Sequence, residues 1–294
     1  MKTGFTVVHP LTQAVLFFSC IFVTMFIMHP VFLGISFVLS TVYILYSQGF
    51  KKLLSALKLN IITSLMIIII NPLISHAGVT VLAYLPDGNA ITLESIVFGA
   101  AAATLMSCTI NWFCCINYAL TSDRVIYLFS RIAPKLGLLI SMTLRFAGKI
   151  SEHYRSVKAA QISFRQDKRS LMQKIKSSAR LMSSVIQWSL ESSVDTADSM
   201  KSRGYATGRR TSYHNFRIKR KDVLLIAAIV SSDMMIIYFS VSEIIYFNYY
   251  PMIEINIESY KSFAAFAAFA MICIIPLITD IREEKLWKHY GSAV

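Results

Sequence analysis

Long apolar segments, separated by polar or charged ones, are the feature that most limits the fold of this chain. They are 16 to 26 residues long, close to the length that an α-helix needs to cross the hydrocarbon core of a bilayer. Each segment must satisfy its own backbone hydrogen bonds in lipid, so each is expected to be a helix. With 55% hydrophobic and 15% charged residues, the composition does not suit a soluble globular domain. We therefore predict an all-α polytopic membrane protein with about six spans, at residues 11–28, 31–46, 59–75, 93–118, 223–247 and 263–278.

The basic residues divide the chain into three regions. Spans 1–4 form an N-terminal membrane region, 1–120, and spans 5 and 6 form a C-terminal one, 223–294. Region 121–222 between them holds 21 of the 29 Lys and Arg residues. Since Lys and Arg collect in cytoplasmic loops, six spans predict that both termini and region 121–222 are cytoplasmic and that only Lys261 faces out. The net charge of +13 comes from basic segments between apolar spans and is not spread over a soluble surface. We therefore expect membrane lipid as a partner, and not nucleic acid.

Region 121–222 is predicted to contain a cytoplasmic pair of long amphipathic helices. An apolar stretch at 136–144 is too short to cross a membrane, and we expect it to lie at the interface and to end at Arg145. The first amphipathic helix follows it. Its apolar face carries Ile150, Tyr154, Val157, Ala160 and Phe164.

The second amphipathic helix is predicted from about Ile175 to Arg203. Gly204 follows it, where a left-handed helix cap is favoured, and Arg203 lies in the last turn, where the helix dipole favours a cation. By itself this pattern also fits an ordinary helix-end arginine. The apolar stripe of the helix needs a partner to cover it, and it consists of Ile175, Ala179, Met182, Ile186, Leu190, Val194, Ala197 and Met200.

Four residues of the membrane regions are expected to act in helix packing. Pro72, next to Asn71, removes a backbone donor and should kink its helix. Gly99 begins a Gly-Ala patch that lets another helix approach closely. Asp233 falls deep in span 5, where it is either a hydrogen-bonding packing residue or a proton or ion site. Outside the membrane, two β-prone runs around a Pro-Asp-Gly turn predict a small hairpin within 78–92.

No catalytic constellation is present in the sequence. It contains no nucleophile elbow, phosphate-binding loop or zinc-protease motif, its six histidines are dispersed, and its five cysteines lack metal-ligand spacing. We therefore expect a chain that is not an enzyme and binds neither a metal nor a cofactor. Any ATP would be hydrolysed by another polypeptide.

Four short blocks lie in order along the chain. Residues 71–78 read Asn-Pro…His-x-Gly, and residues 91–94 read Ile-Thr-x-Glu. The third block contains Arg145, Glu152 and Gln161, and the fourth contains Asp198, Ser202, Arg203, Gly204 and Tyr205. Their order and spacing resemble a known family, the transmembrane T components of energy-coupling-factor (ECF) transporters, which serve vitamin and metal uptake in prokaryotes. In that family the first block follows an early span, the second enters the next span, the third leads to a first Ala-Arg-Gly motif, and the fourth holds a second such motif.

The first Ala-Arg-Gly motif departs from the family pattern. Without gaps it falls on Ser163, Phe164 and Arg165, so that phenylalanine replaces the arginine and arginine replaces the glycine. Either Arg165 makes the expected contact from one position along, or the contact has changed in character. The second motif keeps Arg-Gly, with Ser202 as a small residue before them.

The resemblance implies a non-catalytic coupling subunit in a prokaryotic cell membrane. Two ABC-type ATPases that hydrolyse ATP with Mg would bind the arginine-bearing helix ends, and a membrane S component would bind the substrate. ATPase movement would reach the S component through the two helices. The alternative from another class is a membrane-anchored sensor or regulator, whose basic region binds acidic lipid or a signalling partner.

Overall fold

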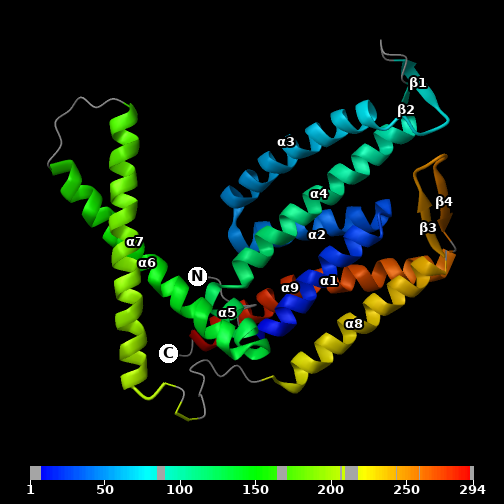
Figure 1. Ribbon diagram of the computed structural model, residues 1–294. Helices are drawn as coiled ribbons and strands as arrows, with labels where there is room; N and C mark the ends of the chain where they lie inside the picture. The colour runs from blue at the N-terminus through cyan, green and yellow to red at the C-terminus, as the bar shows by residue number, and fades with distance from the viewer. Residues whose placement is uncertain are drawn as a thin grey trace. The chain divides into compact units, whose positions relative to one another are not determined.

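The structure is a computed structural model that describes residues 8–84, 90–163, 171–205, 207–208, 218–242, 244–257 and 259–291 (Figure 1). It divides into two compact units. The larger unit comprises residues 1–125 and 216–294, and the insert unit comprises residues 126–215. In chain order the elements are α1 (Pro10–Phe26), α2 (Pro30–Gln48), α3 (Phe50–Ile74), β1 (Val81–Tyr84), β2 (Ala90–Thr92), α4 (Leu93–Ala119), α5 (Ser122–Ile132), α6 (Pro134–Ser163), α7 (Leu171–Ser202), α8 (Arg220–Val241), β3 (Ile245–Asn248), β4 (Glu254–Ile257) and α9 (Ser259–Gly291).

Within the described residues, five helices of the larger unit are long and apolar enough to cross a membrane: α2, α3, α4, α8 and α9. The predicted first span is the helix α1, which is also apolar but has 17 residues. These lengths agree with an all-α chain that crosses a membrane several times. Several helices extend past the apolar segments. For example, α3 begins at Phe50 rather than Leu59, because basic residues such as Lys51 and Lys52 are good helix formers and the helix need not end where the lipid does.

The first two helices begin with the same cap. His9 and His29 each precede a proline at the first helical position, where the missing N–H is not needed. In both, the imidazole Nδ1 accepts a hydrogen bond from the backbone N–H two residues on, at 3.2 Å. Both histidines are buried, with 4% and 3% of their surface exposed. A local His-Pro signal therefore sets the start of α1 and of α2.

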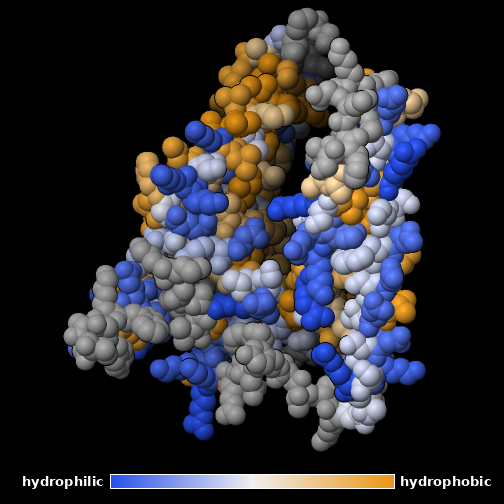
Figure 2. All heavy atoms as spheres, turned by 90° about the vertical axis from the view of Figure 1, so that its left-hand side faces the viewer, coloured by the Kyte–Doolittle hydropathy of each residue, from blue (hydrophilic) through white to orange (hydrophobic). Residues whose placement is uncertain are grey.

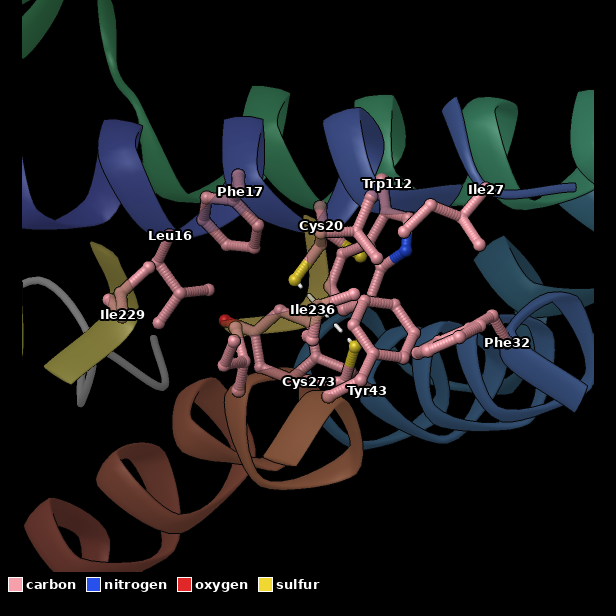
Figure 3. Close-up of a cluster of buried hydrophobic side chains, with 14 of the residues drawn as sticks. Leu16, Phe17, Cys20, Ile27, Phe32, Tyr43, Trp112, Ile229, Ile236 and Cys273 are labelled. Atoms are coloured by element: carbon pink, nitrogen blue, oxygen red, sulfur yellow. Dashed lines mark hydrogen bonds between the residues drawn. The ribbon is translucent and has the colours of Figure 1, made fainter. Parts of the chain in front are cut away.

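The largest core cluster of the larger unit surrounds α1. Leu16, Phe17 and Cys20 of α1 are almost fully buried, and they pack with side chains of α2, α4, α8 and α9. Figure 3 shows these side chains turned toward one another from all five helices, with the Cys20 and Cys273 thiols 3.7 Å apart. Contacts between residues more than 200 positions apart thus unite the beginning and the end of the chain.

Two β-hairpins follow helices of the larger unit. The predicted one is present: β1 and β2 pair antiparallel, with Val81 opposite Thr92. Its turn, at 85–89, lies outside the described residues. The second, formed by β3 and β4 with Ile245 opposite Ile257, was not predicted. Span 5 was expected to run to Phe247, but α8 ends at Val241. The run from Ile245 to Phe247 is as apolar as a span, yet its β-branched and aromatic residues favour a strand.

The insert unit contains α6, α7 and most of α5, and its bounds fall within the predicted region 121–222. The prediction that the stretch at 136–144 ends at Arg145, apart from the helix that follows, is wrong, because α6 continues through Arg145 to Ser163. That the stretch lies at the interface stays a prediction. A charged side chain ends an apolar run without ending a helix. In Figure 2 the long helices of the insert unit carry mainly hydrophilic side chains with scattered hydrophobic ones.

Candidate functional site: the cleft between α6 and α7

Helices α6 and α7 cross within the insert unit (Figure 1), and an aromatic stack holds the crossing. Trp188 of α7 stacks on Phe146 of α6, with 5.8 Å between ring centroids and 2° between planes. It also stacks on His153, at 4.3 Å and 11°. Phe146 and His153 are seven residues apart, which is about two helical turns or roughly 10 Å along one face. The indole therefore lies between the two rings and fixes where α7 crosses α6.

The face of α7 that meets α6 is not the apolar stripe seen in the sequence. Its buried residues are Ser177, Leu181 and Val185, and Ser177 Oγ donates to Gln161 Oε1 of α6 at 3.5 Å. At about 100° per residue, the predicted stripe points to the other side of α7. Its large members from Ile175 to Val194 are exposed, whereas Met200 is half-buried. The exposed fractions are Ile175 66%, Met182 52%, Ile186 55%, Leu190 66% and Val194 62%.

Beside the crossing, α6 and α7 border an open cleft of about 510 Å³. Arg145 and Lys149 line it from α6, Asp195 lines it from α7, and Arg203 lines it directly after the end of α7. Three cations and one carboxylate leave a net charge of +2, so the cleft favours an anionic group. Guanidinium groups can bind carboxylates or phosphates through two parallel hydrogen bonds. Its other lining residues are Ser192, Thr196, Ser199 and Met200.

The end of α7 holds Arg203 at the rim of this cleft. Gly204 has φ +78°, as the sequence predicted for a left-handed cap. Its N–H donates to the Lys201 carbonyl at 3.0 Å, and the N–H of Tyr205 donates to the Met200 carbonyl at 3.1 Å. This is the Schellman pairing. It ends α7 at Ser202 and leaves Arg203 as the cap residue. Glycine is favoured at position 204, because a residue with a Cβ is strained at this φ.

The other residues of the two motif regions are not gathered around the cleft. Glu152 and Asp198 are exposed, and Gln161 accepts the Ser177 hydrogen bond described above. Ser163 is the last residue of α6. Phe164 and Arg165 lie outside the described residues. Of the predicted coupling residues, the structure thus brings Arg145 and Arg203 to one cleft.

The predicted packing residues of the membrane helices meet where α3 ends and α4 begins. Asn71 Nδ2 donates to the Ser95 carbonyl at 2.9 Å. A Cβ added at Gly99 would lie 3.3 Å from Asn71 Cβ and 3.2 Å from its Nδ2, so the glycine permits the close approach. Pro72 lies inside α3, near its end, and is buried.

The segments 71–78 and 91–94, quoted above for their resemblance, also contact each other. Thr92 caps α4 by accepting from the Ser95 N–H at 3.3 Å, and its hydroxyl donates to the Ala77 carbonyl at 2.8 Å. Glu94 accepts hydrogen bonds from the backbone and hydroxyl of Thr80. The two blocks therefore build one polar junction between the end of α3, the first hairpin and the start of α4.

Asp233 of α8 is half-buried and accepts a hydrogen bond from Ser19 Oγ of α1 at 2.8 Å. This contact is what a helix-packing role requires. A proton or ion site remains a separate hypothesis for the same side chain. Among the described residues, no three His, Cys, Asp or Glu side chains are grouped so that they could hold a metal ion.

Three residues that matter for this arrangement were missed from the sequence. Trp188 is off the apolar stripe, and helical spacing from Leu181 and Val185 would have placed it on a second face. Arg124 and Asp222 were given no individual role from the sequence, yet they are buried, with 8% and 7% of their surface exposed. A charged side chain beside a helix start gives no sequence signal of its own burial.

No family model and no curated protein matches this chain.

Proposed function

We propose that this chain is a membrane-coupling subunit of an ATP-driven uptake transporter of the ECF type, similar to a T component. It performs no catalysis itself. The observation that carries the proposal is the cleft of the insert unit, where Arg145 and Arg203 come from two long helices that cross at a fixed aromatic stack. Rigid helices of this length suit a part that passes movement from one protein to another.

The cleft and the altered first motif are the proposed contacts for two ABC-type ATPase subunits. A carboxylate on an ATPase would bind between the guanidinium groups of Arg145 and Arg203. The contact at Ser163, Phe164 and Arg165 would serve the other ATPase. ATP and Mg would stay on the ATPases, and closure of the ATPase pair would move α6 and α7.

Two apolar surfaces support an S component as the second partner. One is the exposed stripe of α7 in the insert unit, from Ile175 to Val194. The other is a groove of about 420 Å³ along α3 in the larger unit, lined by apolar residues such as Leu65 and by Asn60. A substrate-binding membrane protein would cover such surfaces. The proposed setting is a prokaryotic cell membrane with both termini in the cytoplasm.

The test replaces the arginine of the better preserved motif. Arg203→Glu reverses a charge in the cleft, and we expect the chain to remain in the membrane while the ATPases no longer co-purify with it in mild detergent. Arg180→Glu is the matched control, because Arg180 is an exposed arginine of the same helix that does not line the cleft. Wild-type ATPase co-purification in Arg203→Glu would refute the assignment.

The net positive charge of the cleft also suits the second candidate, a membrane-anchored sensor or regulator. Its basic insert would bind acidic lipid or a signalling partner. In that case the purified chain would bind phosphatidylserine vesicles through this cleft, Arg203→Glu would weaken the binding, and no ATPase would co-purify.

A further inference from the structure

The chain leaves the larger unit and returns to it beside two buried charges. Arg124 lies in the first turn of α5, the helix that continues into the insert unit, and Asp222 lies in the first turn of α8, the helix that follows it. Burying a charged side chain is costly unless hydrogen bonds compensate it. The hydrogen-bond partners of Arg124 and Asp222 therefore show what compensates the cost of burying them.

Arg124 is held by the first turns of α1. Its Nη1 donates to Gln13 Oε1 at 2.8 Å and to the Ala119 carbonyl, at the end of α4, at 3.2 Å. The Gln13 side chain is fully buried, and its Nε2 donates back to the Val8 carbonyl at 3.2 Å. One amide thus joins the start of α5 to the segment that begins α1.

Asp222 is held by the same segment. Its Oδ2 accepts from the Lys219 backbone N–H at 2.9 Å, which caps α8. Its Oδ1 accepts from the backbone N–H of His9 at 3.5 Å, a long contact to the residue that caps α1. The carboxylate therefore ties the start of α8 to residues 8–13, as Arg124 ties the start of α5.

We propose that residues 8–13 are a joint that holds both ends of the insert, with Arg124, Gln13 and Asp222 as its positioning residues. A displacement of either end of the insert reaches the same turn of α1. The following turns of α1 carry Leu16 and Cys20, which are buried against neighbouring helices in a close-packed core. Such a core transmits strain rather than absorbing it. The joint does not depend on the proposed function. Only the idea that it carries ATP-driven movement rests on that function.

The joint is tested by hydrogen–deuterium exchange on the full purified chain. Asp222→Asn keeps the shape of the native side chain, and Arg124→Gln replaces the guanidinium by a shorter, neutral amide. We expect each to speed exchange of the amides at 9–16 by about tenfold, the effect of losing one hydrogen bond to a charged group. Each should also speed exchange at the far end of the joint: Arg124→Gln at the start of α8, and Asp222→Asn at the start of α5.

Exposed neighbours provide matched controls. Asp123→Asn and Lys221→Gln change a charge one residue away and should leave exchange at 9–16 unchanged. Gln13→Glu keeps the oxygen that accepts from Arg124 but loses the donor to the Val8 carbonyl, so it should retain part of the protection that Gln13→Leu loses in full. Exchange that rises only in the helix carrying each substitution, with 9–16 protected as in the wild type, would overturn the joint.

A second arm separates this inference from the proposed function. If the ATPases do not co-purify with the wild-type chain, the proposed function fails, and the joint is still decided by exchange on the chain alone. If they do, ATP with Mg should change exchange both in α6 and α7 and at 9–16. An ATP response in α6 and α7 that never reaches 9–16, in wild type as in Arg124→Gln, would refute the joint as a path for movement and leave the proposed function standing.

Discussion

Replacing Trp188 by alanine should loosen the crossing of α6 and α7 while leaving each of them helical. The indole stacks on two rings of α6, those of Phe146 and His153. Alanine is a stronger helix former than tryptophan, so α7 itself should not unfold. The substitution therefore isolates the contact between the helices from the helices themselves.

The expected magnitude follows from the two stacks. A pair of aromatic rings is worth about 0.5 to 1.5 kcal/mol beyond the area it buries, so that two pairs give about 1 to 3 kcal/mol. Since each 1.4 kcal/mol corresponds to about a factor of ten, amides protected by the crossing should exchange roughly 5 to 150 times faster. Trp188→Phe keeps a stacking ring and should lose less than half of this protection.

Hydrogen–deuterium exchange resolved by peptide is the assay, with α6 residues 142–157 as the reporter because they carry no substitution. Leu190→Ala is the control: it removes a large apolar side chain two residues from Trp188, but one that is 66% exposed on the opposite side of α7. If Trp188→Ala leaves exchange in α6 unchanged, or if Leu190→Ala has the larger effect there, the stack does not hold the crossing.

Two further predictions concern a glycine and a histidine. Gly137→Ala should destabilise the insert unit by about 1 to 3 kcal/mol, because the added Cβ would lie 2.5 Å from Ser130 Cα across the turn between α5 and α6. Gly148→Ala, with nothing within 4 Å of the added Cβ, should instead stabilise α6 by up to about 1 kcal/mol. Thermal unfolding of both variants checks this, and equal effects would contradict it. Burial lowers the pKa of His29, in the turn between α1 and α2, below its ordinary 6.5. Its contribution to stability should be fully present above pH 6.5 and be lost as the pH falls toward the folded-state pKa. His29→Asn keeps a capping oxygen but has no titrating imidazole. When the unfolding temperature is measured against pH, its fall on the acid side should therefore be absent in this variant. An unchanged pH profile in His29→Asn would refute the assignment.

Sequence patterns predicted the helical class because lipid demands it of every long apolar segment, and they located the apolar part of each span. Helix ends beyond the lipid depend on local propensity and capping, so the extensions of α3 and α6 were not foreseen. The second hairpin was not predicted, because an apolar run such as Ile245–Phe247 fits both the end of a span and a strand. The sequence signal for this hairpin was Pro251, which favours a turn, followed by isoleucines at alternate positions, which favour a strand.

The candidate site was predicted in part. The glycine cap places Arg203 at a helix end from the sequence alone, because few other residues adopt a positive φ. That Arg145 lines the same cleft depends on how α6 and α7 cross, and the crossing is set by Trp188, off the apolar stripe. The stripe indicated that α7 needs a partner, but not that α6 leaves it uncovered. The burial of Arg124 depends on Gln13, 111 residues away, and long-range pairing of this kind leaves no local pattern.

The position of α1 at the centre of the core has a consequence for how the protein is made. Among the described helices α1 is synthesised before the others, and Cys20 meets Cys273 only after 253 further residues, which takes roughly 13 to 50 s at ordinary rates of translation. For most of that interval Asp233 has not been synthesised, so Ser19 lacks this partner. A 17-residue helix with buried Thr12, Gln13 and Thr24 is a weak membrane segment by itself. Until α8 and α9 emerge, the partners of α1 in the core are therefore limited to α2 and α4.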